Sequence, residues 1–335
     1  MNDAAKFFMK NPAQTSADFI NYVDLASTAG KLGYGCKLDE MLTPALPGDY
    51  ISIMARPGNK KSTFMAALAK RYAMDIKAAG SDDVVIYATW DEAVENIEGY
   101  IAAGFGHYSA GDIAWGRVTR EQAASANVDR VTKLSQLYVW GVSIMDKEHG
   151  KPLFTADWLF KTVQELKHRE GVNVRALFLD YLQIIPVQGE NNRTAQVSEA
   201  SKAAKALAKD IGCPVFAGVQ AGRQADSRED NIPNWSDAQH ASQIEQDSTK
   251  QLALMSPVKY LDNESLALLQ AGKPEMIEKK GVGGKFYEVN DDLTIVRILK
   301  QRGARGAGTV AIGIDKTTLK IYDPTAYLAE LTELS

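Results

Sequence analysis

Short apolar runs alternate with longer segments of helical periodicity along most of this chain, from Gly48 onward. A run of about four to eight apolar residues between turn signals is typical of a buried strand, whereas hydrophobic residues three and four apart are typical of a helix. We predict strands over Tyr50–Met54, Val84–Thr89, Leu137–Val142, Ala176–Leu179, Pro214–Val219, Gln251–Met255 and Leu293–Leu299, and helices over Ser62–Ala79, Ala156–Arg169 and Thr194–Ile211.

This alternation predicts an α/β fold with a mainly parallel sheet and helices on both faces. The runs Thr309–Ile314 and Leu319–Tyr322 predict a closing hairpin, which would add antiparallel strands at the C-terminal side. Residues 256–292 fit the alternation least well, because lysines and the turn Gly281–Gly284 interrupt them. We predict that they form a mobile insertion.

Residues 1–32 are predicted to form an N-terminal segment ahead of one large domain at residues 33–335. Two short amphipathic helices are expected there, over Asp3–Lys10 and Ser16–Ser27, with a helix-breaking stretch at Asn11–Thr15 between them. The second helix either packs on its own domain or docks on a neighbouring subunit, and the sequence favours neither.

The composition is that of an ordinary globular protein, with 335 residues, 45% hydrophobic and 24% charged, and a formal net charge of −4. No global basic field would draw the chain onto nucleic acid, so any nucleic-acid site must be local. The chain lacks a run of about 18 apolar residues and a signal-peptide core, so no membrane span is expected. Two unclustered cysteines, Cys36 and Cys213, favour a reducing compartment such as the cytoplasm of a bacterium or of a virus-infected host cell. The four histidines lack the spacing of a zinc site.

Residues 55–62 nearly match the phosphate-binding loop G-x-x-x-x-G-K-[ST]. In that loop the backbone N–H groups cradle phosphates, the lysine reaches the β- and γ-phosphates, and the hydroxyl holds Mg²⁺. Lys61 and Ser62 match the pattern, whereas Ala55 and Lys60 replace its two glycines. The loop lies between a predicted strand and a predicted helix, which is the context that the motif requires. Lys60 either swings outward or adds a second positive charge near the phosphates.

Three carboxylates follow predicted strands. The run Leu177–Asp180 is an apolar strand ending in an acid, which is typical of the carboxylate beside the Mg²⁺ of a bound nucleotide. Asp91 and Glu92 follow the strand Val84–Thr89, where a carboxylate could orient or deprotonate an attacking water. Two acids at the start of a helix are also favoured by the helix dipole alone, so this second pair has a purely structural explanation as well.

Further polar residues stand at the ends of two other strands. Gln220 ends the predicted strand Pro214–Val219, and such a position points into the ligand crevice of an open α/β sheet. Lys300 and Arg302 lead out of the strand Leu293–Leu299 into a glycine-rich turn. Arg302 could therefore reach the γ-phosphate of a neighbouring subunit as an arginine finger, or it could be a solvated charge at a hairpin tip.

Taken in order, these stretches resemble the replicative hexameric DNA helicase family of the DnaB type, specifically its RecA-like ATPase domain. The resemblance covers about residues 33–323 and rests on many short motifs in family order. Ala55-Arg56-Pro57 is similar to the family's entry to its phosphate loop, in which alanine often replaces the first glycine. The other motifs are Leu179–Gln183, Glu190–Thr194, Ser198–Ser201, Lys205–Lys209, Cys213–Val215, Gln220, Ser236-Asp237, Ile244–Asp247, Lys300–Arg302 and Gly308–Val310.

The resemblance implies ATP and Mg²⁺ as ligands of one site. Ser62 and Asp180 would hold Mg²⁺, and Asp91 would be the catalytic carboxylate with Glu92 beside it. Gln220 would sense the γ-phosphate, and Lys300 and Arg302 would act across a subunit interface. The residues implied to contact ATP are Ala55, Arg56, Pro57, Gly58, Asn59, Lys60, Lys61, Ser62 and Thr63.

The resemblance also implies a homo-oligomer, in the form of a hexameric ring around single-stranded DNA. Loops near residues 187–196 and 223–243 would face the channel, and the candidate DNA contacts there are Asn192, Arg193, Arg223, Arg228, Gln239 and His240. Apart from Lys60, two features depart from the family. Asp237–Ser242 replaces the family's Arg-Glu-x-Gly, and only about 45 residues precede the core, so we expect no large N-terminal primase-binding domain. A replication partner could then engage the N-terminal helices.

We therefore predict an ATP-dependent, ring-forming DNA helicase or translocase that acts on single-stranded DNA in replication. The alternative is a nucleotide-responsive DNA-binding scaffold or loader with weak unwinding, which Lys60, Asp91 and the altered channel stretch motivate. A small-molecule kinase built on the same loop is disfavoured, because the sequence shows no acceptor-site constellation.

Overall fold

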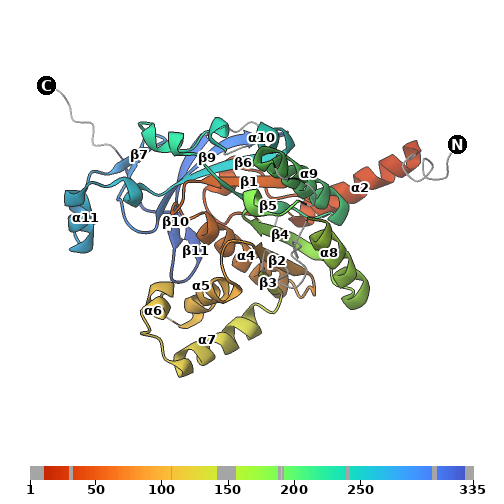
Figure 1. Ribbon diagram of the computed structural model, residues 1–335, viewed down its shortest axis with the longest axis horizontal. Coiled ribbons are helices and arrows are strands. Elements are labelled where there is room, and N and C mark those ends of the chain that lie inside the picture. The colour runs from red at the N-terminus through yellow and green to blue at the C-terminus, as the bar shows by residue number, and fades with distance from the viewer. Residues whose placement is uncertain are drawn as a thin grey trace.

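A layered α/β architecture is present in the computed structural model, with helices on both faces of a central sheet (Figure 1). The structure describes residues 11–29, 33–106, 108–141, 156–187, 190, 192–238, 242–303 and 308–328. The helix predicted over Asp3–Lys10 lies outside these residues.

The central sheet has nine strands in the described ranges, in the order β11-β10-β9-β6-β1-β5-β4-β2-β3. The strands from β6 to β3 run parallel, whereas β9, β10 and β11 pair antiparallel with their neighbours. This confirms the predicted parallel sheet with antiparallel C-terminal strands. The strands are β1 (Tyr50–Ala55), β2 (Val84–Thr89), β3 (Leu137–Gly141), β4 (Val174–Asp180), β5 (Val215–Gln220), β6 (Lys250–Met255), β9 (Leu293–Gln301), β10 (Gly308–Asp315) and β11 (Lys320–Tyr322).

Both faces of the sheet are apolar, because the parallel strands carry hydrophobic side chains in both directions. In β1, Ile51 and Ile53 pack in the core beneath α4 (Lys61–Ala78), and Met54 packs in the opposite core beneath α9 (Arg193–Ile211). The other helices around the sheet are α3 (Leu38–Met41), α5 (Val94–Gly106), α6 (Ala110–Ala114), α7 (Arg120–Lys133), α8 (Ala156–Glu170) and α10 (Ser242–Asp247).

Aromatic rings fix α4 against the middle of the sheet. Phe178 of β4 and Phe216 of β5 stack with their centroids 4.6 Å apart, and Tyr72 of α4 packs on both rings at 6.1 and 5.8 Å. All three side chains are fully buried. Such ring pairs add packing energy beyond their buried area, so they help to hold the first turn of α4 at the C-terminal ends of the strands.

Residues 256–292 form secondary structure of their own, beside β9 and β10. Ile277, Val282 and Tyr287 share a small core with Met255 and Ile295 of the central sheet. The strands β7 and β8 form a separate antiparallel sheet with β12. The mobility of this segment stays a prediction. The elements of the segment are the 3₁₀ helices η4 (Pro257–Tyr260) and η5 (Pro274–Met276), α11 (Asn263–Gln270), β7 (Lys280–Val282) and β8 (Lys285–Tyr287). The third strand of the small sheet, β12 (Ala326–Leu328), follows the central sheet in sequence.

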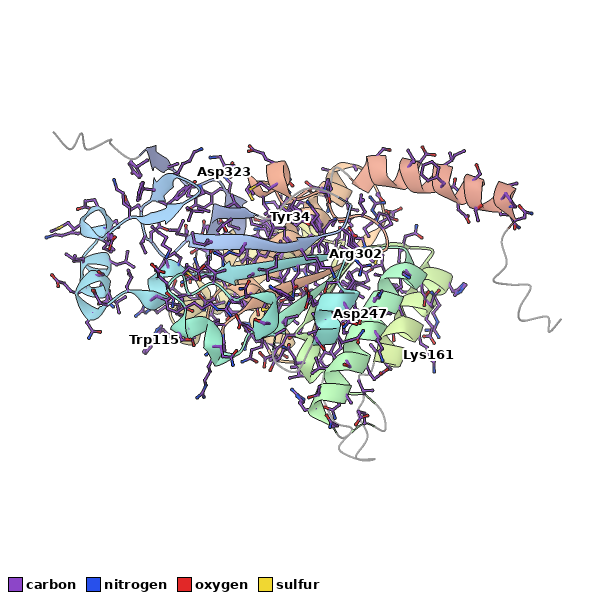
Figure 2. The ribbon with its side chains drawn as sticks, turned by 90° about the horizontal axis from the view of Figure 1, so that it is seen from above. Tyr34, Trp115, Lys161, Asp247, Arg302 and Asp323 are labelled. Carbon is purple, nitrogen blue, oxygen red and sulfur yellow. The ribbon has the colours of Figure 1, made fainter. Side chains whose placement is uncertain are left out.

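The helix α2 (Pro12–Ala29) extends away from the sheet in both views of the chain (Figure 1, Figure 2). The helix break expected at Asn11–Thr15 is wrong for Pro12–Thr15, which are helical, whereas Asn11 precedes the helix. Asn11 and Gln14 exchange capping hydrogen bonds of 2.9 Å, and Pro12 takes the first turn, where a missing N–H costs nothing. Apolar side chains of α2 are exposed: Phe19 at 65%, Ile20 at 58% and Val23 at 48%. Neither α2 nor any other helix of the described residues is long and apolar enough to span a bilayer.

The aromatic stack yields a stability prediction. We expect Phe216→Ala to lower the free energy of unfolding by about 4 kcal/mol, because it removes a fully buried ring and leaves a cavity beneath α4. Urea unfolding followed by circular dichroism would measure this loss. Phe19→Ala, which truncates an exposed ring on α2, serves as the control and should cost far less. Equal costs for the two variants would contradict the assigned core.

Candidate functional site

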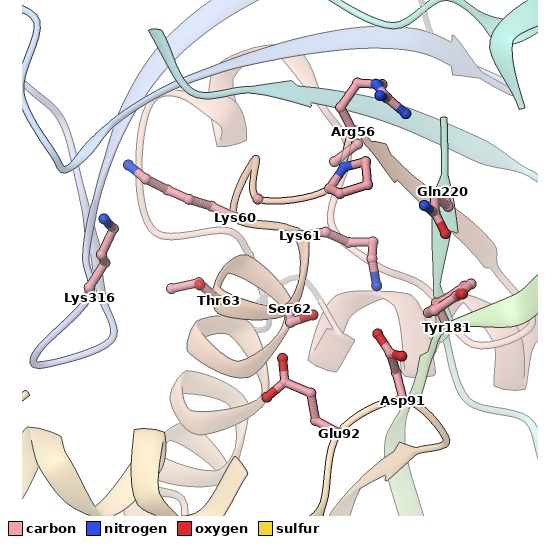
Figure 3. Close-up of a pocket in the computed structure, with 13 residues that line it drawn as sticks. Arg56, Lys60, Lys61, Ser62, Thr63, Asp91, Glu92, Tyr181, Gln220 and Lys316 are labelled. Carbon is pink, nitrogen blue, oxygen red and sulfur yellow. The ribbon is translucent and has the colours of Figure 1, made fainter. Parts of the chain in front are cut away.

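A cavity of about 460 Å³ opens where β1, β2 and β5 end and the chain turns into loops (Figure 3). Of the nine loop residues predicted to contact ATP, only Asn59 does not line it. The candidate residues Asp91, Glu92 and Gln220 do line it, although they are far apart in sequence. The full lining is Ala55, Arg56, Pro57, Gly58, Lys60, Lys61, Ser62, Thr63, Asp91, Glu92, Tyr181, Gln220 and Lys316.

The backbone of the loop keeps the path that glycine normally provides. Gly58 and Lys60 both have positive φ angles, of 75° and 61°. Glycine takes this left-handed conformation without strain, so Lys60 keeps the conformation of the residue that it replaces. Lys60 is also the residue before α4, and its carbonyl accepts the hydrogen bond of Phe64 N at 2.8 Å. The substitution therefore leaves the loop-to-helix geometry intact.

The side chain of Lys60 points away from the cavity (Figure 3). Its ammonium donates to the carbonyl of Leu293 at 3.1 Å and to Oγ1 of Thr294 at 3.3 Å, at the start of β9. Burial, helped by the nearby charge of Lys316, lowers the pKa of Lys60 to about 7. Of the two orientations considered from the sequence, the structure has the outward one.

Lys61, whose side chain is 14% exposed, forms an ion pair with the buried Asp180 beneath the loop. Tyr87 donates its hydroxyl to the other carboxylate oxygen at 2.7 Å, and the ammonium of Lys61 lies 4.9 Å from the ring centre of Tyr181. Burial alone would raise the pKa of Asp180, but the charge of Lys61 and hydrogen bonds from Lys61, Ser62 and Tyr87 outweigh it and hold this pKa below its usual range. Asp180 is therefore an anion, placed directly behind the residues that would meet phosphate.

Asp91 and Glu92 come to the cavity from the end of β2. The hydroxyl of Thr89 accepts the backbone N–H of Glu92 at 3.1 Å and donates to its carbonyl at 3.0 Å, which fixes the turn. Burial, followed by the charges of Asp180 and Asp91, raises the pKa of Glu92. One buried carboxylate oxygen of Glu92 has no hydrogen-bond partner among the described residues. Figure 3 shows Asp91 below Lys61 and Tyr181, and Glu92 closer to Ser62.

Gln220 is held through its backbone by the side chain of Gln183, which leaves the side chain of Gln220 available to face the cavity. Gln183 donates its amide to the carbonyl of Gln220 at 2.9 Å and accepts the backbone N–H of Gln220 at 3.1 Å. The end of β5 is thereby tied to the turn that follows Asp180. A polar side chain at a strand end is positioned as the sequence predicts.

Several site residues were not predicted from the sequence. Tyr181 and Gln183 lie within the motif Leu179–Gln183, which stands out in the sequence without indicating a role for either residue. No local pattern marks the others. Gly218 of β5 leaves room for the ion pair, because a Cβ there would lie 2.7 Å from the ammonium of Lys61. Tyr87 contacts Asp180, and Lys316 reaches the cavity from the β10–β11 turn.

Two predicted nucleotide contacts face the outer side of the loop. The guanidinium of Arg56 pairs with Asp226 at 2.8 Å and donates to the carbonyl of Ala221 at 2.9 Å. The side-chain oxygen of Asn59 accepts the backbone N–H of Ser256 at 2.7 Å. These side chains anchor the loop to other segments.

Lys300 and Arg302 lie at the ends of the strands that are opposite to the cavity. Gln301 is in register with Lys250, the first residue of β6, whereas the cavity begins at Ala55, the last residue of β1. Lys300 donates to the carbonyl of Glu245, and Arg302 donates to that of Gln246 at 2.7 Å, near Asp247 (Figure 2). Neither cation can reach the cavity of its own chain.

The candidate DNA contacts have mixed surroundings. Asn192 caps α9 by accepting the backbone N–H of Thr194 at 2.9 Å, and Arg228 forms a 2.8 Å ion pair with Asp237. Both side chains are thus already engaged within the chain. Arg193 and Arg223 are exposed, and Gln239 and His240 lie outside the described residues.

Comparison with known proteins identifies the family. Residues 33–319 match the model of the DnaB-like helicase C terminal domain. The chain belongs to this family. It is 27% identical over 224 residues to the replicative DNA helicase DnaB of Mycoplasma genitalium, and the aligned region covers 63% of this chain and 43% of that protein. It is 34% identical over 126 residues to DnaB of Rickettsia felis, which covers 37% of this chain and 24% of that protein. This DnaB-like chain therefore spans less than half the length of these relatives.

Two solved structures confirm the fold. The first is described as an ATPase domain, and it has a TM-score of 0.68 and 21% identity, with 94% of this chain and all of that chain covered. The second is a DnaB-like replicative helicase, described with its interactions with primase. It has a TM-score of 0.65 and 20% identity, with 86% of this chain and 62% of that chain covered. The RecA-like core expected from the sequence is thus present.

The ion pair between Lys61 and Asp180 of this DnaB-like domain yields a second prediction. We expect Lys61→Met to lower the free energy of unfolding by about 3 kcal/mol, because Asp180 would remain buried as an unpaired anion. Adding Asp180→Asn should recover most of that loss. Urea unfolding without nucleotide measures both. Lys209→Met, at an exposed position of α9, is the control. A loss no larger than that of this control would contradict the assigned pair.

Proposed function

We propose that this chain is the ATPase motor domain of a ring-forming replicative DNA helicase, which translocates on single-stranded DNA. The observation that carries the proposal is the Lys61–Asp180 pair beneath a strand-to-helix loop that has the backbone path of a phosphate loop. Family membership supports the same function, since the matched relatives are replicative DNA helicases. A cytoplasmic location follows from this function.

ATP would bind with its phosphates against the backbone N–H groups of the loop and the start of α4, where the helix dipole favours anions. Lys61 would then exchange its contact with Asp180 for one with a phosphate. The donor set also fits Mg²⁺, because Ser62 and the anionic Asp180 adjoin each other and this ion usually takes one or two protein oxygens together with substrate phosphates. When bound, Mg²⁺ would neutralise charge that develops on the phosphates.

Hydrolysis needs a carboxylate that orients the attacking water. We assign this role to Asp91, which lies below Lys61 and Tyr181 in the cavity (Figure 3). The charge of Asp180 acts on Glu92, so Glu92 would face the metal side of the nucleotide. The side chain of Gln220, whose backbone Gln183 fixes, would contact the γ-phosphate and report its loss to β5.

A complete site requires a second subunit in this proposal. Lys300 and Arg302 stand at the strand ends far from the cavity of their own chain, so they would reach the nucleotide of a neighbouring copy, as a finger residue does. A hexameric ring supplies that arrangement at each interface. The exposed apolar residues of α2 offer a surface for a neighbouring subunit or a replication partner. Arg193 and Arg223 are the exposed candidates for contacts with DNA phosphates, which would weaken with salt.

The motor function predicts unwinding that depends on Lys61. Wild-type protein with ATP and Mg²⁺ should separate a forked duplex, and Lys61→Ala should reduce the rate at least about 100-fold, because a cation that stabilises the transferring phosphoryl group is gone. Strand-displacement fluorescence measures the rate, and Lys77→Ala is the matched control. Equal inactivity of wild type and Lys61→Ala, with DNA binding retained, would contradict the motor. Slow hydrolysis with nucleotide-dependent assembly would instead favour a scaffold or loader.

The two acids of the cavity can be separated by kinetics. We expect Asp91→Asn to lower kcat for ATP hydrolysis about 100-fold with little change in nucleotide affinity, because the water would lose its orienting carboxylate. Glu92→Gln should lower kcat less, and should weaken the dependence on Mg²⁺ concentration. Steady-state assays at several Mg²⁺ concentrations test this. A larger loss of kcat in Glu92→Gln would transfer the catalytic role to Glu92.

A further inference from the structure

The outer side of the phosphate loop contacts the first residue of the segment 256–292 and the start of β9, which directly follows that segment. Ser256, its first residue, donates its backbone N–H to Oδ1 of Asn59 at 2.7 Å. Leu293, which directly follows the segment, accepts a hydrogen bond from the ammonium of Lys60 at 3.1 Å. Asn59 is 2% exposed and Lys60 7% exposed, so water does not compete for either contact.

A second set of contacts runs along the same side of the loop. Tyr260 of η4 accepts a hydrogen bond from Asn59 at 3.4 Å and donates one to Asp226 at 3.1 Å. Asp226 in turn pairs with Arg56. The segment therefore contacts Asn59 directly, precedes the β9 residues that hold Lys60, and meets Arg56 through Asp226.

Lys60 is the informative residue among these, because glycine would hold the same backbone with less strain. At a φ of 61° a β-carbon is unfavourable, so the backbone of lysine has no advantage over that of glycine here. Its side chain is used to reach Leu293 and Thr294, with Asp291 and Asp292 nearby and Lys316 opposing them. A tether is what lysine offers here and glycine cannot.

We propose that Asn59 and Lys60 are positioning residues that tie the phosphate loop to the first residue of the 256–292 segment and to the start of β9 just after it, so that nucleotide binding and the order of this segment are coupled. The inference rests on the proposed function, since it requires nucleotide at the loop. Coupling of this kind is reciprocal, so whatever steadies the segment strengthens nucleotide binding by the same factor. The segment is thereby a place where a binding partner would change nucleotide affinity without entering the cavity.

Hydrogen–deuterium exchange of the wild-type protein tests the coupling directly. Saturating ADP with Mg²⁺ should slow amide exchange in residues 256–262 and 277–295, in addition to the loop itself. Nucleotide binding is measured in parallel by titration with fluorescent ADP. If ADP binds and exchange in the segment does not change, the coupling is overturned and the proposed function stands. If ADP does not bind at all, both are overturned.

Variants of the tether separate positioning from folding. Lys60→Gly suits the backbone and removes the side chain, Lys60→Met keeps the length and removes the donors, and Asn59→Ala removes the other contact. Each should raise the Kd for ADP about tenfold and abolish the slowed exchange of the segment at saturating ADP, with KM for ATP raised and kcat little changed. Lys273→Gly removes an exposed lysine of the same segment and should behave as wild type. Retention of the slowed exchange in all three tether variants would overturn the proposal.

Discussion

The ion pair of Lys61 and Asp180 is the constraint on which the rest of the site depends. Asp180 is an anion taken out of water and needs a cation beside it, and this one requirement fixes several elements at once. Tyr87 of β2 bonds to the carboxylate, and Gly218 of β5 leaves the space for the ammonium. β2 and β5 are thereby held in place beside the start of α4. Because Lys61 already has a partner, phosphate at this loop would exchange one anion for another rather than meet a bare charge.

The same loop has an inner and an outer side with different tasks. Its inner side presents backbone N–H groups, Lys61 and Ser62 to the cavity. On its outer side, Arg56, Asn59 and Lys60 reach other segments that lie far away in sequence. A loop built only for phosphate would need no long side chains on that outer side. The contacts of Arg56, Asn59 and Lys60 therefore tie the loop to its surroundings, and the exposed Arg223 stands just three residues before Asp226, the partner of Arg56.

The fold could be predicted largely from the sequence, because the apolar runs of buried parallel strands are local signals. Val84–Thr89 and its neighbours were found to within a few residues. The site was predictable where a motif is contiguous, as at Lys61, or where a strand ends, as at Gln220. The direction of the Lys60 side chain could not be predicted, since Leu293 and Thr294 are more than 200 positions away. Gly218 was missed for the same reason: its purpose is the space it leaves for Lys61. At Asn11–Thr15 the sequence pattern predicts Pro12 to be a helix breaker, whereas with Asn11 as the cap it begins the helix.

The geometry of the sheet also limits what one copy of the chain can do. The cavity lies at the C-terminal ends of the parallel strands, and β9 runs antiparallel to them, so its end carries Arg302 away from the cavity. Within a single chain the phosphate site therefore has Lys61 but no second cation from the finger segment. Arg302 instead donates to the carbonyl of Gln246, and Lys300 to that of Glu245, at the end of α10. If both side chains are to meet a neighbour's nucleotide, they must leave these carbonyls. Assembly and catalysis would then share the same two side chains, and the position of α10 would depend on whether an interface has closed.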